Sequence, residues 1–233
     1  MKKILCIKRQ ENSESRPYRE EYEIDPGDSN VTIAAALRLL SEENRIYAER
    51  DIPYRALVWE CSCLQRKCGA CAMVVDNVPC LACDRRVGDS RGERIVIEPL
   101  RKFPLICDLM VDRSIMDEML YEHEVWLKGR AKEKNDDIAF EASKCIKCGL
   151  CLEICPNWHL EGSFGGMAAM TSFARLMAKE PEEQLRERAS HYKTAVYNGC
   201  GKSLACRDIC PASVDIEKLL VKSNAAAIWK RRM

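Results

Sequence analysis

The sequence has little of several features that would assign it to a common class of protein. Its 37 Lys and Arg residues nearly balance 36 Asp and Glu, so no excess of positive charge is available for binding nucleic acid. Histidines number three, and aromatic residues make up only 6% of the chain. The longest uncharged run, residues 162–174, is shorter than the roughly 18 apolar residues of a membrane-spanning helix. We therefore expect no nucleic-acid partner and no direct membrane span.

Cysteine is unusually abundant, with 15 residues in a chain of 233. Residues 1–10 alternate apolar and polar side chains as a strand does and contain no hydrophobic secretion segment, so we expect thiols made in a reducing compartment. An odd number of cysteines also leaves one unpaired in any scheme of disulfides alone. Metal sites are therefore the favoured use of these residues.

Apolar periodicity predicts a different architecture in each half of the chain. Strands are expected at residues 3–9, 18–25, 70–76, 78–83 and 94–99, with a helix at 32–48. After residue 107 the strand signal disappears, and we expect helices at 114–128, 167–179 and 214–230, with a surface loop at 128–137. The predicted fold class is α+β, with a β-grasp domain at residues 1–106 and an all-helical domain at 107–233.

The first cysteine group has the spacing of a [2Fe–2S] site in a plant-type ferredoxin. Four, two and eleven residues separate its members, Cys63, Cys68, Cys71 and Cys83. A four-residue loop lets two thiolates approach a cluster from opposite sides while backbone amides point inward. Gly69 and Ala70 fit this role because large side chains there would block the approach.

A four-thiolate zinc site is the alternative for the same segment, because two Cys-x2-Cys pairs occur in it. These pairs are Cys68 with Cys71 and Cys80 with Cys83. The zinc interpretation leaves Cys63 without a role and does not use the four-residue spacing. Cys63 and Cys80 are therefore the residues that discriminate between the two interpretations.

The second group has the spacing of a bacterial ferredoxin, in which the fourth cysteine serves a different cluster from the first three. It consists of Cys145, Cys148, Cys151 and Cys155, followed by Pro156. The proline fixes its φ angle and turns the backbone away, which suits a segment that serves two clusters. The first three thiolates need a fourth from elsewhere in the chain.

The third group supplies that ligand and leaves a second site with three thiolates. It consists of Cys200, Cys206 and Cys210, followed by Pro211, and Ser203 stands where an ordinary two-cluster ferredoxin has its middle cysteine. Cys210 can complete a [4Fe–4S] site with Cys145, Cys148 and Cys151. Cys155, Cys200 and Cys206 then give only three thiolates, which indicates [3Fe–4S], with a Ser203 alkoxide as the alternative fourth ligand.

Four cysteines stand outside these three sets: Cys6, Cys61, Cys80 and Cys107. Small buried apolar side chains are the ordinary use of such residues. The alternative makes Cys61 and Cys80 redox-active residues or substitute ligands beside the first cluster.

In their order and spacing, the three cysteine groups resemble those of the iron–sulfur subunit of succinate dehydrogenase and quinol:fumarate reductase. Residues 103–112 also look like the segment that joins the two domains in that family. The resemblance implies a plant-type ferredoxin domain followed by a helical bacterial-ferredoxin domain. It further implies docking between a flavoprotein with covalent FAD and a membrane anchor that binds quinone, on the cytoplasmic side of the plasma membrane. The dicarboxylate would react on the partner chain, so no catalytic residue is expected in this one.

The sequence departs from the family pattern beside the third centre. The family often has Cys-Pro-Ser followed by aromatic residues, where this chain has Asn157, Trp158 and His159, and many members have histidine where this chain has Gly201. The resemblance places Trp158 and His159 near a quinone. From the residues alone, Trp158 suits a packed core as well as a quinone wall, and His159 suits a surface or interface better than cluster ligation.

Electron relay through three clusters is the function that the sequence favours, with succinate oxidation and fumarate reduction both open. A soluble thiol-linked fumarate reductase or a heterodisulfide-reductase-like module is the alternative, since either would use the same clusters with another donor. A zinc-stapled binding protein is a third possibility, of a different class. A partner without membrane spans would favour the thiol-linked or heterodisulfide-reductase-like alternative. A colourless preparation that contains zinc and no iron would favour the zinc-stapled binding protein.

Overall fold

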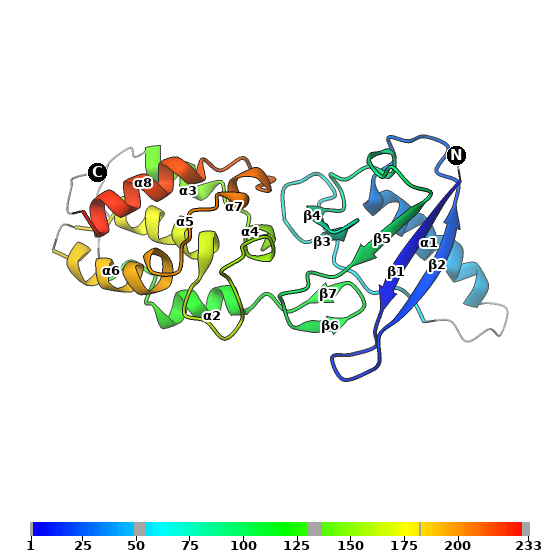
Figure 1. The fold of residues 1–233 in the computed structure, drawn as a ribbon, viewed down its shortest axis with the longest axis horizontal. Helices are drawn as coiled ribbons and strands as arrows, with labels where there is room; N and C mark the ends of the chain where they lie inside the picture. The colour runs from blue at the N-terminus through cyan, green and yellow to red at the C-terminus, as the bar shows by residue number, and fades with distance from the viewer. Residues whose placement is uncertain (1, 49–54, 130–136, 182, 230–233) are drawn as a thin grey trace. The chain divides into compact units, whose positions relative to one another are not determined.

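In the computed structural model the described residues are 2–48, 55–129, 137–181 and 183–229 (Figure 1). The chain separates into two compact units, Met1–Asp112 and Arg113–Met233. The boundary predicted between residues 106 and 107 falls inside a short strand, and the division lies after Asp112 instead. Among the described residues, none of the helices combines the length and apolar character needed to span a bilayer.

The first unit is a mixed five-stranded sheet with a helix, as the alternating pattern predicts. The sheet consists of β1 (Lys3–Arg9), β2 (Tyr18–Ile24), β3 (Ala72–Val75), β4 (Val78–Leu81) and β5 (Arg94–Glu98). Their spatial order is β2-β1-β5-β3-β4, with β1 and β5 parallel and the other pairs antiparallel. Helix α1 (Ile33–Ala48) covers one face, which buries Ile33 and Leu37 completely (Figure 1). The expected β-grasp architecture is confirmed.

The hairpin of β3 and β4 brings two cysteine-bearing segments together. Asp76 and Asn77 form its turn with φ angles of 49° and 64°, which short polar side chains tolerate. At the other end of the hairpin, the Ala82 N–H donates to the Cys71 carbonyl over 2.9 Å. The two strands are shorter than predicted: β3 begins directly after Cys71, and β4 ends two residues before Cys83.

A second hairpin corrects the prediction that strands end at residue 107. It consists of β6 (Leu105–Cys107) and β7 (Met110–Val111), and β7 is too short to give a periodic signal. Its turn residue, Asp108, is completely buried and accepts hydrogen bonds from the N–H groups of Gln10 and Val58, each over 3.0 Å. The Arg9 guanidinium donates to the same carboxylate over 3.1 Å. These contacts fix residues 105–111 to the first unit.

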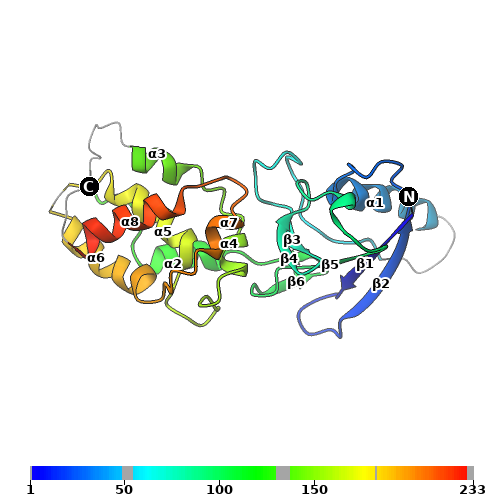
Figure 2. The same ribbon diagram turned by 45° about the horizontal axis from the view of Figure 1, so that its top comes forward.

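The second unit is helical and packs around α5 (Gly166–Met177), which lies among its neighbours in the middle of the unit (Figure 2). The uncharged run at 162–174 is explained by this position, because ten of the twelve residues of α5 are buried. The other helices are α2 (Ile115–Glu122), α3 (Asp137–Ser143), α4 (Leu150–Glu153), α6 (Leu185–Tyr192), α7 (Ala205–Asp208) and α8 (Ile216–Ala227). Short helical turns lie at Val87–Asp89 (η1) in the first unit and at Lys193–Tyr197 (η2).

Two predicted helices are longer than those observed. The helix predicted at 114–128 ends at Glu122, and Glu124 takes a φ of 53°. Buried Arg188 explains the change, because its guanidinium donates to the carbonyls of Glu124 and Trp126 and pairs with Glu180 over 2.7 Å. The helix predicted at 214–230 ends at Ala227 as α8, and residue 230 lies outside the described residues, as do residues 130–136 of the predicted loop.

Candidate iron–sulfur centres

The loop after Cys63 directs backbone N–H groups at two sulfur atoms. The Cys63 Sγ accepts from the amides of Gln65 and Lys67, over 3.4 and 3.3 Å. The Cys83 Sγ accepts from the amide of Arg66 over 3.3 Å. Successive amides that point into one concavity form an anion site, and this geometry suits thiolates that bind a cluster.

Strained backbone positions produce this arrangement of amides. Leu64 and Arg66 have φ angles of 53° and 60°, and Gly69 has 75°. A left-handed conformation costs a residue with a side chain roughly 1–2 kcal/mol, so the surrounding structure must enforce it. A loop of this shape is what a cluster surrounded by inward-facing amides requires.

The four predicted thiols of the first unit form two contacting pairs. The pKa of Cys63 is lowered to about 7 by the Gln65 amide, a hydrogen bond with the Cys68 thiol and the Lys67 amide. The pKa of Cys71 is raised to about 12 by burial and by its contact with Cys83. Cys63 therefore lies against Cys68, and Cys71 against Cys83.

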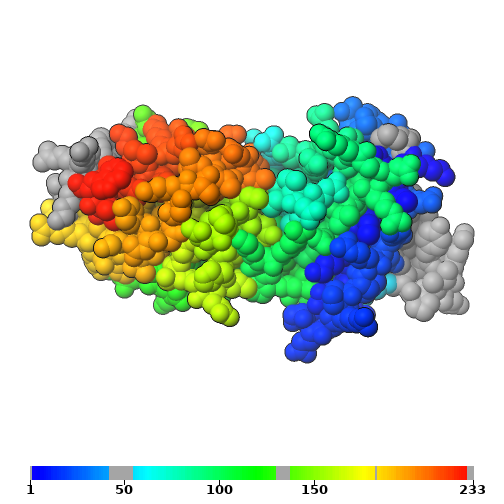
Figure 3. Space-filling model, in the orientation of Figure 1, coloured from blue at the N-terminus to red at the C-terminus, as the bar shows by residue number. Residues whose placement is uncertain are grey.

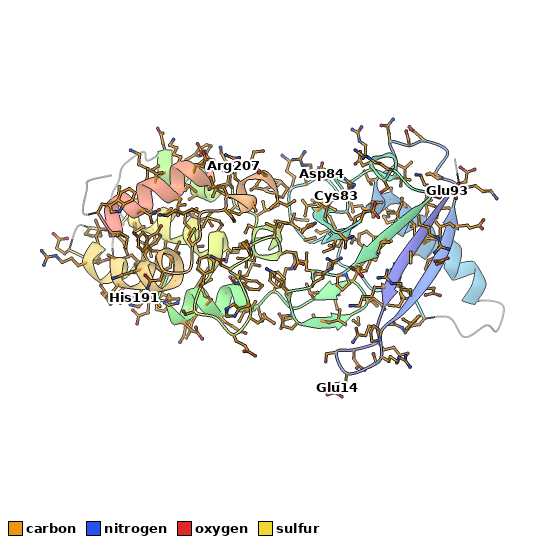
Figure 4. All side chains as sticks on the ribbon, viewed as in Figure 1. Glu14, Cys83, Asp84, Glu93, His191 and Arg207 are labelled. Carbon is orange, nitrogen blue, oxygen red and sulfur yellow. The ribbon has the colours of Figure 1, made fainter. Side chains whose placement is uncertain are left out.

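Cys80 lies in a different environment from these four residues. It is on β4 opposite Met73, and burial raises its pKa to about 12. The charged groups that act most on it are Arg85 and Asp84 rather than the other thiols. Figure 4 shows Cys83 and Asp84 next to each other beyond the end of β4. The four predicted [2Fe–2S] ligands are thus neighbours in two pairs, whereas Cys80 is surrounded mainly by charged side chains, and which of these thiols bind a metal stays a prediction.

The cysteines of the second unit separate into two sets by their mutual electrostatic influence. Burial raises the pKa of Cys148 to about 11, and the neighbouring Cys145 and Cys210 thiolates add to the shift. Burial also raises the pKa of Cys206 to about 11, and the neighbouring Cys155 and Cys200 thiolates add to this shift. These sets are the ones that the ligand spacing predicts.

Cys151 lies where the two sets meet. Burial raises its pKa well above the usual value, and thiolates of both sets contribute: Cys148, Cys145, Cys206 and Cys210. It also lines the cavity that Cys155, Cys200 and Cys206 share. The two sets are thus adjacent, which places two clusters within one small helical unit.

Ser203 lies on the wall of the same cavity as these three cysteines. The loop around it has left-handed residues at Lys202 and Leu204, with φ angles of 58° and 59°, and Lys147 in the Cys145 segment has 50°. The backbone strain found beside Cys63 therefore recurs in both cysteine-rich segments of the helical unit. Left-handed residues beside the cysteines are thus common to the first loop and to these two segments.

Trp158 and His159 lie apart from the residues that line this cavity. Trp158 is 5% exposed and lines a second cavity with Met116, Met119 and other residues. His159 is exposed, and its ring lies over Gly162, where a Cβ would be 2.7 Å from the imidazole. The structure thus gives Trp158 a packing role, and their place beside a quinone stays a prediction.

Comparison with known proteins agrees with this geometry. Residues 4–118 match the family described as the 2Fe-2S iron-sulfur cluster binding domain, and residues 141–214 match the 4Fe-4S dicluster domain. The succinate dehydrogenase iron-sulfur subunit of Bacillus subtilis is 30% identical over 94% of this chain and 90% of its own length. The fumarate reductase iron-sulfur subunit of Escherichia coli O6:H1 is 30% identical over 91% of this chain and 87% of its own.

A solved structure, the Mycobacterium smegmatis Sdh1 complex in the apo form, contains a chain of the same fold. The TM-score is 0.67 at 19% identity, over 97% of this chain and 96% of that one. A ferredoxin-like sheet unit followed by a helical unit with paired cysteine sets defines a class of multi-cluster iron–sulfur proteins. Within this class, the chain belongs to the family of succinate dehydrogenase and fumarate reductase iron–sulfur subunits.

Proposed function

We propose that this chain relays single electrons between flavin and quinone in a succinate:quinone or quinol:fumarate oxidoreductase. The observation that carries the proposal is geometric: backbone amides of one loop point at the sulfurs of Cys63 and Cys83, and in the helical unit Cys151 lines the cavity that Cys155, Cys200 and Cys206 share. A chain with three groups of predicted ligands suits conduction, because hydride chemistry at flavin moves two electrons and iron–sulfur clusters move one at a time.

We assign the ligands of the three centres as follows. Cys63, Cys68, Cys71 and Cys83 would hold [2Fe–2S], while Cys145, Cys148, Cys151 and Cys210 would hold [4Fe–4S], and Cys155, Cys200 and Cys206 would hold [3Fe–4S]. The amides of Gln65, Arg66 and Lys67 stabilise negative charge on the thiolates of the first group. Such hydrogen bonds and burial are the protein's means of setting a cluster's potential.

Ser203 supports three irons rather than four at the last centre. It lies on the cavity wall, and in the chain it takes the position of the middle cysteine of an ordinary two-cluster ferredoxin. A hydroxyl is far less acidic than a thiol, so it is a poor ligand for iron at neutral pH. A [3Fe–4S] centre has a relatively high potential, which suits exchange with quinone.

The partners in this proposal are a flavoprotein with FAD and a membrane-anchor subunit with quinone. The dicarboxylate would react on the flavoprotein, and this chain would attach to the cytoplasmic side of the plasma membrane through its partners. Family membership and similarity to the two relatives over nearly their whole lengths support this assembly. Trp158 and His159 would lie in the vicinity of the quinone.

The test is purification of the intact assembly through a tag on this chain. We expect a coloured complex that contains a flavoprotein and a membrane subunit, and whose visible iron–sulfur absorbance bleaches on addition of succinate or of a quinol. A partner without membrane spans would favour the thiol-linked or heterodisulfide-type alternative. A colourless preparation that contains zinc without iron would contradict the proposal.

A further inference from the structure

Asn157 connects two of the segments that carry the predicted ligands of the third centre. Its side-chain Nδ2 donates to the carbonyl of Gly199 over 2.7 Å. Asn157 lies two residues after Cys155, and Gly199 directly precedes Cys200. In the space-filling view the segment between α4 and α5 meets the segment between η2 and α7 on the surface of the helical unit (Figure 3).

The absence of a side chain at Gly201 provides the space in which the Asn157 side chain lies. A Cβ on Gly201 would lie 2.7 Å from the Asn157 Nδ2, closer than such atoms approach each other. Gly201 does not have a positive φ angle, so its backbone would accept alanine. A side chain at position 201 would therefore clash with the Asn157 side chain.

The glycine on the other side of Cys200 is confined in a similar way. A Cβ on Gly199 would lie 2.3 Å from the ring of Phe164. Cys200 thus lies between two glycines, and each of these contacts a side chain from the segment that follows Cys155. Asn157, Phe164 and Gly201 all line the cavity of the three cysteines.

We propose that Asn157 is a positioning residue for the three-cysteine centre, and that it depends on the missing side chain at Gly201. The inference rests on the proposed function, because it concerns the cluster that Cys155, Cys200 and Cys206 would hold. Asn157 and Gly201 are both exposed at the rim of the cavity. Their contact controls the position of the backbone next to Cys200 and the access of water, two quantities that affect a cluster's potential.

The two positions should be coupled in a way that a double-mutant cycle can detect. Asn157→Ala removes the hydrogen bond to Gly199. Gly201→Ala should have the same consequence by another route, because the new methyl group pushes the flexible amide of Asn157 aside. Once Asn157 is alanine, no amide is left to displace, so the double variant should resemble either single variant.

The experiment uses the intact complex and follows the resonance of the oxidised three-iron centre together with its midpoint potential. We expect Asn157→Ala and Gly201→Ala to shift both quantities, and the double variant to shift them no further. Asn157→Leu keeps the bulk of the side chain without the N–H donor, and should shift them as well. Asn198→Ala is the control, because Asn198 is exposed on the same loop and outside the residues that line the cavity.

Two results would overturn the inference. In one, the Asn157 variants match Asn198→Ala. In the other, the shifts produced by Asn157→Ala and Gly201→Ala add. The potential and the resonance are readouts that a loss of stability alone would leave in place in the assembled complex. If the unmodified complex lacks the three-iron signal, the cluster assignment itself is refuted. Failure of the proposed function can therefore be distinguished from failure of this inference.

Discussion

At the residue scale, Cys63 and Cys80 decide the nature of the first centre. The Cys63 thiol lies against Cys68 and accepts two amide hydrogen bonds, while Cys80 is half-buried on β4 near Arg85. Cys63→Ala should therefore abolish or severely alter the resonance of the reduced [2Fe–2S] cluster, and Cys80→Ala should leave it intact. Electron paramagnetic resonance of the two reduced variants checks this, and the opposite pattern would revive the zinc-type pairing.

Ser203 provides a second prediction at the residue scale. Ser203→Cys should convert the last centre to [4Fe–4S], because a thiolate at this wall of the cavity can bind the missing iron. The oxidised three-iron resonance should disappear, the iron content should rise, and quinone-linked turnover should slow as the potential falls. Turnover with an artificial acceptor controls for intact flavin chemistry. A four-iron centre in the unmodified protein would refute the assignment.

At the element scale, the Asp108 carboxylate holds the β6–β7 hairpin to the first unit together with backbone hydrogen bonds from Asp108 to Gln10 and from Leu109 to Val58. Burial of Asp108 alone would raise its pKa, but the amides of Val58 and Gln10 and the Arg9 guanidinium hold the pKa below its usual range. The stability that this carboxylate contributes is therefore fully present above its unfolded pKa of about 4, and is lost as the pH falls through the lower folded value.

Asp108→Asn should destabilise the first unit by roughly 1–3 kcal/mol, since Arg9 and two buried amides lose a charged acceptor while Arg9 keeps its ion pair with Glu20. Asparagine tolerates the φ of 46° at this position, so the substitution tests charge rather than backbone strain. Amide hydrogen exchange of residues 105–111 and of β1 in the intact complex measures the effect. Glu23→Gln, which breaks an exposed pair with Lys2, is the matched control and should change stability by about 0.5 kcal/mol or less. Equal effects would contradict this account of Asp108.

The sequence predicted regular elements well where one pattern dominated. β1 has the predicted bounds because its apolar residues, Ile4 to Ile7, are flanked by charged residues on both sides, whereas the ligand sets that the cysteine spacing indicates stay a prediction. β7 and the early end of α2 could not be predicted, because tertiary contacts of Asp108 and Arg188 decide them. The bond from Asn157 to Gly199 joins residues 42 apart in sequence, and only the fold shows that they meet.

At the scale of the whole molecule, the rim of the three-cysteine cavity should be covered in the assembled complex. Asn157, Gly201 and Ser203 are exposed in this chain, and an exposed terminal cluster would lose electrons to oxygen. Hydrogen exchange of the backbone amides of residues 157–158 and 200–203 should therefore slow when the membrane subunit is bound. Residues 11–15, an exposed turn, serve as an internal reference. Unchanged exchange at the rim would place the membrane subunit elsewhere.

The central claim is that one chain holds three different clusters. The most direct measurement is a redox titration of the intact complex followed by electron paramagnetic resonance, combined with iron and acid-labile sulfide analysis. The account predicts a three-iron signal in the oxidised complex, two-iron and four-iron signals that appear on reduction, and iron sufficient for all three centres. A complex without the oxidised three-iron signal, or with iron for a single cluster, would contradict it.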